Sequence, residues 1–464
     1  MGFIFFISIG FVVPFNFPSD SDKKNQIHYD IKLQINSYSY SIEWLKSWNF
    51  SVFQSHEILN EKAYLIAVSQ DGKHIIASGN YGYCSPGEWE GNAFLVKLNE
   101  RGDYFWNKTL SPSSGQNFPE KLFFSSDNNY YFFLTGVHGM LCEQFDHCLY
   151  KYDKNGNLHY SIRNYSSDRA FTMALDSVEN IYIVGQTYAE GKMFVSKYNR
   201  SGDFIWWQLY DTGAASLYDI NTDSQGNFFV INAKSLMKLN SNGNLIWTIN
   251  LSDSRKIRID QNNKIYILTN SELIEFDGDG NKLLQIVTTS SLIELDENNN
   301  LYLLEANELV KLDSNGSREI LLFDNHISAF CIDSEANIYT TGILDGDFIV
   351  KKYGIDSDHD NLTDWTETNI YFTNPNYYDS DGDDLSDGEE VNTYFTDPNN
   401  EDTDGDGFTD GEEITKGFDP NDKFSKPSSK PSIPYVSILL TLLVASLTVV
   451  IIIIMLRKRN ITSS

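Results

Sequence analysis

The sequence predicts an all-β fold built from one unit of four short strands that is repeated along the chain. The clearest copy of this unit is Ala170–Tyr210, where runs of β-branched and aromatic residues alternate with turns rich in Asn, Asp, Ser and Gly. Short runs between such turn residues are typical of antiparallel hairpins. The unit recurs about seven times in the 464 residues, and this self-similarity indicates a repeat architecture.

Within this copy a turn or loop separates each strand from the next. We expect strands at Ala170–Leu175, Ile181–Val184, Met193–Tyr198 and Phe204–Leu209. The turn between the third and fourth strands contains Gly, and six units carry Gly at this place: Gly102, Gly156, Gly202, Gly243, Gly280 and Gly316. A Gly at one fixed turn position is expected where the backbone needs a positive φ.

The number of units follows from the segments that look like second strands: 74–79, 130–136, 180–185, 227–233, 264–270, 300–306 and 337–342. The seventh unit has a third strand at 348–354 but no fourth strand after it. Upstream of the first complete unit, residues 38–53 contain Trp48. Its setting is like that of a fourth-strand Trp in three of the units: Trp106, Trp206 and Trp247. This upstream stretch therefore looks like a fourth strand without its first three.

A ring of sheets that closes by pairing a strand from each end of the chain leaves only short, protected edges. The strand count therefore predicts a seven-bladed β-propeller over residues 38–354, with blade seven completed by a strand near 47–53. The repeats resemble the bacterial and archaeal β-propeller repeat family with the pattern D-x-x-G-N-x-Y-x-x-G followed by K-x-x-x-x-G-x-x-x-W. This resemblance covers about two thirds of the chain and implies a fold rather than a function.

The charge of the chain is concentrated after the propeller. The formal net charge is −29, and residues 356–422 hold 22 Asp and Glu residues against one Lys. Binding to nucleic acid is disfavoured, because it requires basic patches. The sequence contains no G-x-S-x-G elbow, no H-E-x-x-H helix and no Gly-rich phosphate loop, so we expect a protein that is not an enzyme.

Three acidic segments begin 23 residues apart, at Asp356, Asp379 and Asp402. Each places carboxylates at positions 1, 3, 5, 9 and 12 of a twelve-residue loop, which is the pattern of a calcium loop whose position-7 ligand is a backbone carbonyl. The predicted calcium ligands are Asp356, Asp358, Asp360, Leu362, Asp364, Glu367, Asp379, Asp381, Asp383, Leu385, Asp387, Glu390, Asp402, Asp404, Asp406, Phe408, Asp410 and Glu413. A solvated acidic linker is the alternative, but it would not repeat in register.

Position 6 of the third loop is Gly407, as the sharp turn of a calcium loop requires. Asn361 and Asp384 stand there in the first and second loops, and both residue types tolerate a positive φ. We therefore expect the third loop to bind calcium most tightly. The loops resemble thrombospondin type 3 repeats, which implies a calcium-wrapped stalk with little hydrophobic core over residues 355–422.

The two ends of the chain predict export and anchoring. Residues 3–17 are an apolar run, which we interpret as part of a signal peptide at 1–18, with a buried N-terminal strand as the alternative. A Ser-, Pro- and Lys-rich spacer at 423–434 precedes 22 uncharged residues at 435–456, long enough for a transmembrane helix. The basic residues that follow predict a cytoplasmic tail at 457–464.

The cysteines are too few for a disulfide scaffold. Cys142 and Cys148 flank five residues in a loop of blade two, and an exported protein could form a local disulfide there. Cys84 occupies the equivalent loop of blade one and could compete for either. Cys331 lies in a first strand, where we expect a buried free thiol.

The connections between second and third strands are long in blades one to three and short in blades four to six. One face of the propeller should therefore be built up on one side, with these ligand contacts: Tyr81, Tyr83, Trp89, His138, His147 and Tyr188. Exposed aromatic residues on loops suit recognition of proteins or sugars. The alternative is that these side chains pack against their own loops.

Together these features predict a single-pass surface protein with its N-terminal part outside the cell and a short tail in the cytoplasm. The propeller would be held away from the membrane by a calcium-binding stalk and would bind an extracellular protein or glycan. The alternatives are a tethered hydrolase or lyase acting on extracellular polysaccharide, and a purely structural component of a surface layer.

Overall fold

The computed structural model describes residues 40–427 except 49–59, 86–87, 111–115, 139–143, 167, 213–216 and 314. The predicted signal peptide, transmembrane helix and tail lie outside these residues. Within the described part of the chain, no helix is long and apolar enough to cross a membrane. The chain divides into two compact units between Glu367 and Thr368.

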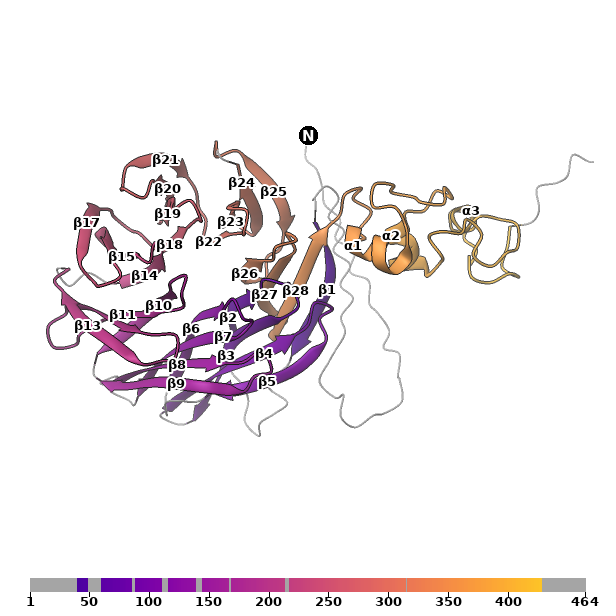
Figure 1. Ribbon diagram of the computed structural model, residues 1–464. Helices are drawn as coiled ribbons and strands as arrows, with labels where there is room; N and C mark the ends of the chain where they lie inside the picture. The colour runs from indigo at the N-terminus through magenta and orange to yellow at the C-terminus, as the bar shows by residue number, and fades with distance from the viewer. Residues whose placement is uncertain are drawn as a thin grey trace, which may run out of the picture. The chain divides into compact units, whose positions relative to one another are not determined.

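The first unit consists of four-stranded antiparallel sheets, here called blades, which follow one another around a ring (Figure 1). In blades three to six the spatial order of the strands equals their order in the sequence. Their strands are β10 (Arg169–Leu175), β11 (Ile181–Gln186), β12 (Met193–Tyr198), β13 (Phe204–Tyr210); β14 (Leu217–Thr222), β15 (Phe228–Asn232), β16 (Ser235–Leu239), β17 (Leu245–Asn250); β18 (Lys256–Ile259), β19 (Ile265–Leu268), β20 (Glu272–Phe276), β21 (Lys282–Val287); and β22 (Leu292–Leu295), β23 (Leu301–Glu305), β24 (Glu308–Leu312), β25 (Arg318–Phe323).

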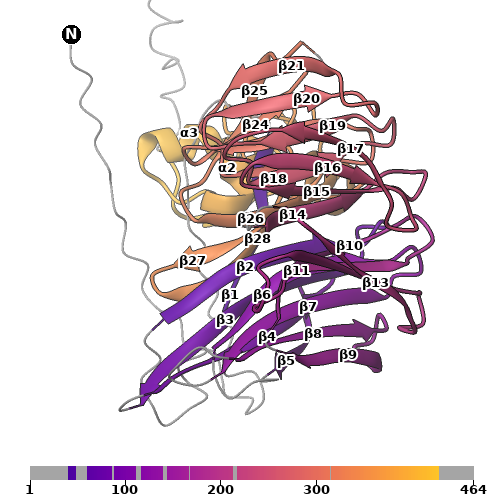
Figure 2. The ribbon, with the colours of Figure 1, turned by 90° about the vertical axis from the view of Figure 1, so that its left-hand side faces the viewer.

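Blades one and two are joined into one sheet of eight strands by a parallel bridge between Gly91 and Gln116. Their strands are β2 (Asn60–Val68), β3 (Ile75–Ser85), β4 (Glu88–Leu98), β5 (Tyr104–Leu110), β6 (Gln116–Phe124), β7 (Tyr130–His138), β8 (Gln144–Tyr152) and β9 (Leu158–Ser166). The central hairpins β3–β4 and β7–β8 are longer than those of the later blades (Figure 2). The prediction of long loops is therefore wrong for these two blades, because the ladder continues along both strands almost to the tip.

Blade seven contains strands from both ends of the propeller. β26 (Ile327–Ile332), β27 (Ile338–Leu344) and β28 (Asp347–Ile355) are completed by β1 (Tyr40–Trp48), which pairs antiparallel with β28 (Figure 1). The described strands therefore form a seven-bladed propeller closed by an N-terminal strand, as predicted.

The closing strand lies upstream of its predicted position near 47–53. Trp44 pairs with Lys352, just as Trp106 pairs with Lys97, and each pair stands beside a one-residue bulge in the outer strand. Trp44, not Trp48, therefore occupies the position of the fourth-strand Trp. Trp48 is instead the last residue of β1, where it pairs with Phe348 near the beginning of β28 and is buried.

The hydrophobic core consists of clusters, each of which lies between two neighbouring blades. Between blades seven and one, for example, the rings of Phe348 and Phe94 meet edge to face with centroids 4.8 Å apart. Aromatic residues dominate the fully buried side chains, and each adds a large apolar area to the interface between blades. The ring is therefore held together by contacts between sheets as well as by strand pairing.

The turn glycines also lie at these interfaces. A Cβ on Gly102, whose φ is +75°, would stand 2.8 Å from the ring of Trp44 on the preceding blade. Gly156 meets Trp106 of its preceding blade in the same way, again at 2.8 Å. Glycine is thus required at this position for its positive φ and for the close approach of the neighbouring outer strand.

The acidic segment contains only short helical elements: α1 (Asp364–Thr366), the π-helical turn η2 (Glu367–Tyr371), α2 (Asp387–Glu389), the π-helical turn η3 (Glu390–Tyr394) and α3 (Asp410–Lys416). Over residues 368–427, all of them described, Leu385 is the one large apolar side chain that is buried. This segment therefore has little hydrophobic core, as the sequence predicts, and its fold depends on polar groups.

Candidate metal centre

The three acidic loops adopt the same backbone conformation at the predicted sharp turn. At position 6, φ is +74° for Asn361, +77° for Asp384 and +97° for Gly407. The expectation that Asn and Asp can replace Gly at this turn is therefore confirmed. These residue types reach the left-handed region more readily than others because their short polar side chains bond to nearby backbone.

Backbone amides of each loop donate to the carboxylates at positions 1 and 9. In the second loop, Asp379 accepts from the N–H of Gly382 at 2.7 Å and of Asp384 at 3.0 Å. Asp387 accepts from the N–H and hydroxyl of Ser380 at 2.8 and 2.6 Å. The other loops repeat this pattern at Asp356, Asp364, Asp402 and Asp410. These bonds bend the loop around its own carboxylates.

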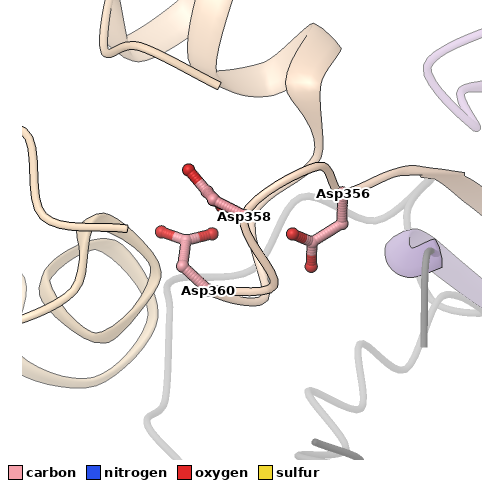
Figure 3. A group of neighbouring side chains, drawn as sticks. All are labelled: Asp356, Asp358 and Asp360. Carbon is pink, nitrogen blue, oxygen red and sulfur yellow. The ribbon is translucent and has the colours of Figure 1, made fainter. Parts of the chain in front are cut away.

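The carboxylates at positions 1, 3 and 5 gather at one place in each loop. One oxygen of Asp356, one of Asp358 and one of Asp360 lie within 4.8 Å of one another, and Figure 3 shows the three side chains on a single turn. The corresponding residues of the other two loops form groups of the same size: Asp379, Asp381 and Asp383, and Asp402, Asp404 and Asp406. The structure thus brings together the first three predicted ligands of every loop.

A helix cap brings the ligands at positions 9 and 12 to the loop. Thr363, Ser386 and Thr409 at position 8 each accept a hydrogen bond from a backbone N–H one helical turn later. In the second loop the cap is reciprocal, since the N–H of Ser386 donates in turn to the carboxylate of Glu389. The sequence reasoning missed these caps, although in the second and third loops a Ser or Thr followed three residues later by Glu is a recognisable signal.

The glutamates at position 12 are completely buried: Glu367, Glu390 and Glu413 are each 0 % exposed. Both carboxylate oxygens of Glu413, and Oε2 of Glu390, have no hydrogen-bond partner among the described residues. The same is true of both oxygens of Asp381. Because a buried charge without a partner is costly, these carboxylates fit a cation as their missing partner.

The electrostatics of the loops point the same way. Burial, and then the carboxylates of Asp381 and Asp383, raise the pKa of Glu390 to about 9. Burial and the neighbouring Asp406 and Asp404 raise the pKa of Glu413 to about 7. Each glutamate is therefore held among like charges, and a divalent cation would relieve this repulsion.

The donor set decides which kind of cation could be held. The predicted donors are carboxylate oxygens and, at position 7, the backbone carbonyl of Leu362, Leu385 and Phe408. Hard oxygen donors in a flexible loop suit calcium, which accepts six to eight oxygens, better than zinc, which prefers nitrogen and sulfur. The residues present therefore fit calcium.

The second and third loops are also bonded to each other. The N–H of Gly411, at position 10 of the third loop, donates to Asp383 Oδ2 of the second loop at 2.8 Å. A Cβ on Gly411 would lie 2.2 Å from the backbone oxygen of Asp383, so only Gly fits there. The side chain of Asn421 donates to the carbonyl of Tyr394 at 2.9 Å. The sequence reasoning did not identify these contacts between loops.

The ligand contacts predicted on the propeller are confirmed as exposed at only one described position. Tyr81 and His147 are 7 % and 2 % exposed, because both lie on long hairpin strands that pack inside the propeller. The prediction that they are exposed contacts is therefore wrong, and burial lowers the pKa of His147 to about 4. Tyr188 is 71 % exposed on the turn after β11. The remaining three also lie on strands, and their side chains are outside the described part: Tyr83, Trp89 and His138.

The predicted disulfide involves Cys142, which lies outside the described residues, so it stays a prediction. Cys148 is 1 % exposed and packs in the core between blades one and two. Cys331 lies on β26, where it has a free thiol and is partly buried against the core between blades seven and one.

A cluster of buried charges inside the propeller was not expected from the sequence. Asp219 on β14 is completely buried, and its carboxylate forms ion pairs with Lys121 at 2.7 Å and with Arg258 at 3.3 Å. Arg258 also donates to Glu294 at 2.8 Å. These residues come from the first strands of four different blades, so the cluster joins blades that are distant in the sequence.

Comparison with known families identifies part of the acidic segment. Residues 379–401 and 402–423 each match the family model of the bacterial TSP3 repeat. Residues 379–423 are two bacterial TSP3 repeats. These repeats are of the calcium-binding type, and they contain the second and third acidic loops. The first loop, which starts at Asp356, lies outside the matched residues.

No curated protein matches the sequence of this chain. Among solved structures, the WD40 domain of Pan2 from Neurospora crassa is 10 % identical with a TM-score of 0.48, covering 62 % of this chain and 88 % of its own. The β-propeller domain of the Trilobed protease from Pyrococcus furiosus is 10 % identical with a TM-score of 0.44, covering 64 % and 94 %. BamB from Moraxella catarrhalis is 15 % identical with a TM-score of 0.36, covering 71 % and 95 %. The fold assignment rests on the sheet topology described above.

Proposed function

We propose that this chain is an extracellular surface protein in which a propeller binds a protein or glycan and is carried by calcium-loaded repeats. The observation that supports it best is the set of buried carboxylate oxygens without a hydrogen-bond partner among the described residues, Oε2 of Glu390 and both oxygens of Glu413, in two bacterial TSP3 repeats. Calcium sites of extracellular modules have dissociation constants of about 10⁻⁴–10⁻³ M, which suits the calcium concentration outside cells. A segment with almost no apolar core would therefore fold where calcium is plentiful.

The ends of the chain give this proposal its topology. A signal peptide at 1–18 would export the propeller, and the uncharged residues 435–456 would anchor the chain, with the basic residues after them in the cytoplasm. The calcium-loaded segment would then stand between anchor and propeller.

Blade three offers the best described surface for that binding. Tyr188 is 71 % exposed, and on β13 the alternate residues Ile205, Trp207 and Leu209 are all exposed. Soluble proteins rarely leave such residues together on an outer strand without a partner, and aromatic side chains dominate the energetics of many interfaces. These side chains would contact the protein or glycan.

The experiment is binding of purified residues 19–434 to cell surfaces and to a glycan panel, with calcium and with chelator. Binding should require calcium. The affinity should fall at least about tenfold in Tyr188→Ala or Trp207→Ala, which is the effect expected when one important interface side chain is removed. The matched control is Phe105→Ala, which removes an exposed aromatic residue from the outer strand of blade one. Failure to bind any surface, or equal loss in the control, would contradict the proposal. Self-association of the fragment would favour a structural role in a surface layer instead.

A further inference from the structure

The first acidic loop differs from the other two in what precedes it. It belongs to the same compact unit as the propeller, and its first residue, Asp356, directly follows the last residue of β28. The matched TSP3 repeats begin only at residue 379. This loop is therefore a part of blade seven as much as a part of the acidic segment.

The closing strand of the propeller bonds directly to this loop. Ser41 on β1 donates from its hydroxyl to Oδ2 of Asp356, the residue at position 1. Ser41 also pairs with Gly354 in the β1–β28 ladder, two residues before Asp356. Asp356 is 2 % exposed, so the acceptor of this hydrogen bond is buried. One carboxylate thus belongs both to the acidic loop and to the seam that closes the ring.

The helix cap of the loop packs on the same seam. A Cβ on Gly354 would lie 3.0 Å from Cβ and Cγ2 of Thr363, the position-8 residue, which is 2 % exposed. The absence of a side chain at Gly354 therefore allows the loop to lie flat against β28. Any movement of the loop would disturb the last residue pairs of the ladder.

Position 10 shows that the loop is adapted to this place. The other two loops have Gly388 and Gly411 there, and Gly411 lies against the backbone of the preceding loop. The first loop follows a strand rather than a loop, and it carries Trp365 instead. The Trp365 ring centroid is 5.7 Å from Nζ of Lys352, which in turn bonds to Glu43 of β1 at 2.9 Å. A second chain of contacts therefore joins the loop to the closing strand.

The donor set of the loop fits calcium as those of its neighbours do. It has the same cluster at positions 1, 3 and 5, the same positive φ at Asn361 and a completely buried Glu367 at position 12. Calcium would draw Asp356, Asp358 and Glu367 toward one point and so fix the loop. Since Asp356 and Thr363 also contact the seam, fixing the loop would fix the end of the β1–β28 ladder.

We propose that the first acidic loop is a calcium site of the propeller itself, and that calcium bound there holds the closing strand β1 in blade seven. This inference rests on the calcium binding in the proposed function but adds a separate consequence. The closed ring becomes a calcium-dependent state, whereas the two TSP3 repeats order only their own segment.

Hydrogen exchange of the full chain, followed by mass spectrometry with and without calcium, tests this inference. Opening of β1 must release the ion, so calcium at about 100 times its dissociation constant should slow amide exchange in residues 40–48 by about 100-fold. In Glu367→Gln this slowing should be lost, while calcium should still protect residues 379–416. The matched control, Glu413→Gln, should lose protection in the third loop and keep it in residues 40–48.

A second variant separates the seam from the ion. Ser41→Ala leaves every predicted calcium ligand in place, so calorimetry should find the same number of bound calcium ions, while calcium should protect residues 40–48 less than in the wild type. This variant decides the question if Glu367→Gln does not fold. Protection of residues 379–416 without any effect on residues 40–48 would overturn the inference and leave the proposed function intact. Absence of calcium protection throughout would overturn both.

Discussion

Ser41 donates a hydrogen bond to Asp356, across 315 positions of sequence, and joins the first strand of the propeller to the loop that follows its last strand. The ends of the ring are therefore secured by side chains beyond the backbone ladder. A propeller closed by strands from both ends depends on this seam, because every other blade is continuous in sequence.

Gly102→Ala should destabilise the propeller more than Gly226→Ala. Both glycines have a positive φ, of +75° and +79°, so each substitution should cost about 1 kcal/mol of backbone strain. Only at Gly102 would the new Cβ lie 2.8 Å from Trp44, which should add about 1–3 kcal/mol of overpacking. Urea unfolding in the presence of calcium measures the difference. Equal losses would show that Trp44 does not pack against this turn.

Gly411→Ala should weaken calcium binding by the second and third loops together. The added methyl group would meet the backbone of Asp383 at 2.2 Å, so the two loops must separate and the bond from the Gly411 N–H to Asp383 must break. We expect the apparent affinity in calorimetry to fall at least about tenfold, since one lost hydrogen bond to a charged group contributes about 1.5–3 kcal/mol.

The control for this substitution is Gly417→Ala. Gly417 also has a positive φ, of +80°, at the end of α3, but nothing lies within 4 Å of its Cβ position. It should therefore lose some helix stability and little calcium affinity. A similar affinity for calcium in both variants would argue against contact between the loops.

Ser386→Ala should weaken the second loop in particular. The Ser386 side chain caps α2 and forms a capping box with Glu389, and loss of such a cap costs about 1 kcal/mol. Because the cap orients the helix that carries Asp387 and Glu390, calcium affinity of this loop should fall several-fold. Ser380→Ala gives a comparison within the same loop, because it removes a hydroxyl that bonds to Asp387 and leaves the cap in place. Unchanged calcium affinity in Ser386→Ala would contradict the role of the cap.

The buried charge cluster around Asp219 predicts how the propeller responds to acid. Burial by itself would raise the pKa of Asp219, but Lys121, Lys256 and Arg258 outweigh it and hold the pKa at about 2. A carboxylate with a depressed pKa adds stability above the unfolded-state value of about 4 and loses it as the pH falls toward 2. The shift of about two units corresponds to about 2–3 kcal/mol.

Unfolding of the wild type and of Asp219→Asn between pH 5 and pH 2 would measure this contribution. The variant should be less stable at pH 5, because the buried cationic partners of Asp219 no longer face a negative charge. Its stability should also fall less steeply than that of the wild type as the pH decreases. Parallel pH profiles of the two proteins would show that Asp219 does not titrate as described.

The repeat number and the three acidic loops could be predicted from the sequence because both are periodic and local. Turn glycines such as Gly202 and the carboxylates that start at Asp402 are set by neighbours a few residues away. The predicted position of the closing strand is wrong because residue type alone matches Trp48 to the fourth-strand Trp of other blades. Ile42 and Trp44 carry the better signal, an apolar residue two positions before Trp, as at Tyr104 and Trp106.

Other features depend on tertiary contacts that leave no local pattern. Tyr81 and His147 look like loop residues because Gly, Ser and Asp stand nearby, yet the hairpin ladders extend far enough to bury them. Gly411 resembles an ordinary loop glycine in the sequence, because its contact with Asp383 of the preceding repeat exists only in the folded structure. Ser41 in the seam is equally inconspicuous, because its partner is at the other end of the propeller.

The central claim is that the acidic loops hold calcium at buried carboxylates, and calorimetric titration of the full chain with calcium tests it most directly. We predict binding in the wild type and a smaller number of bound ions in the double variant Glu390→Gln and Glu413→Gln, whose glutamates are both 0 % exposed. Circular dichroism should show calcium-dependent ordering that the double variant loses in part. Absence of binding in the wild type, or full binding in the double variant, would contradict the account.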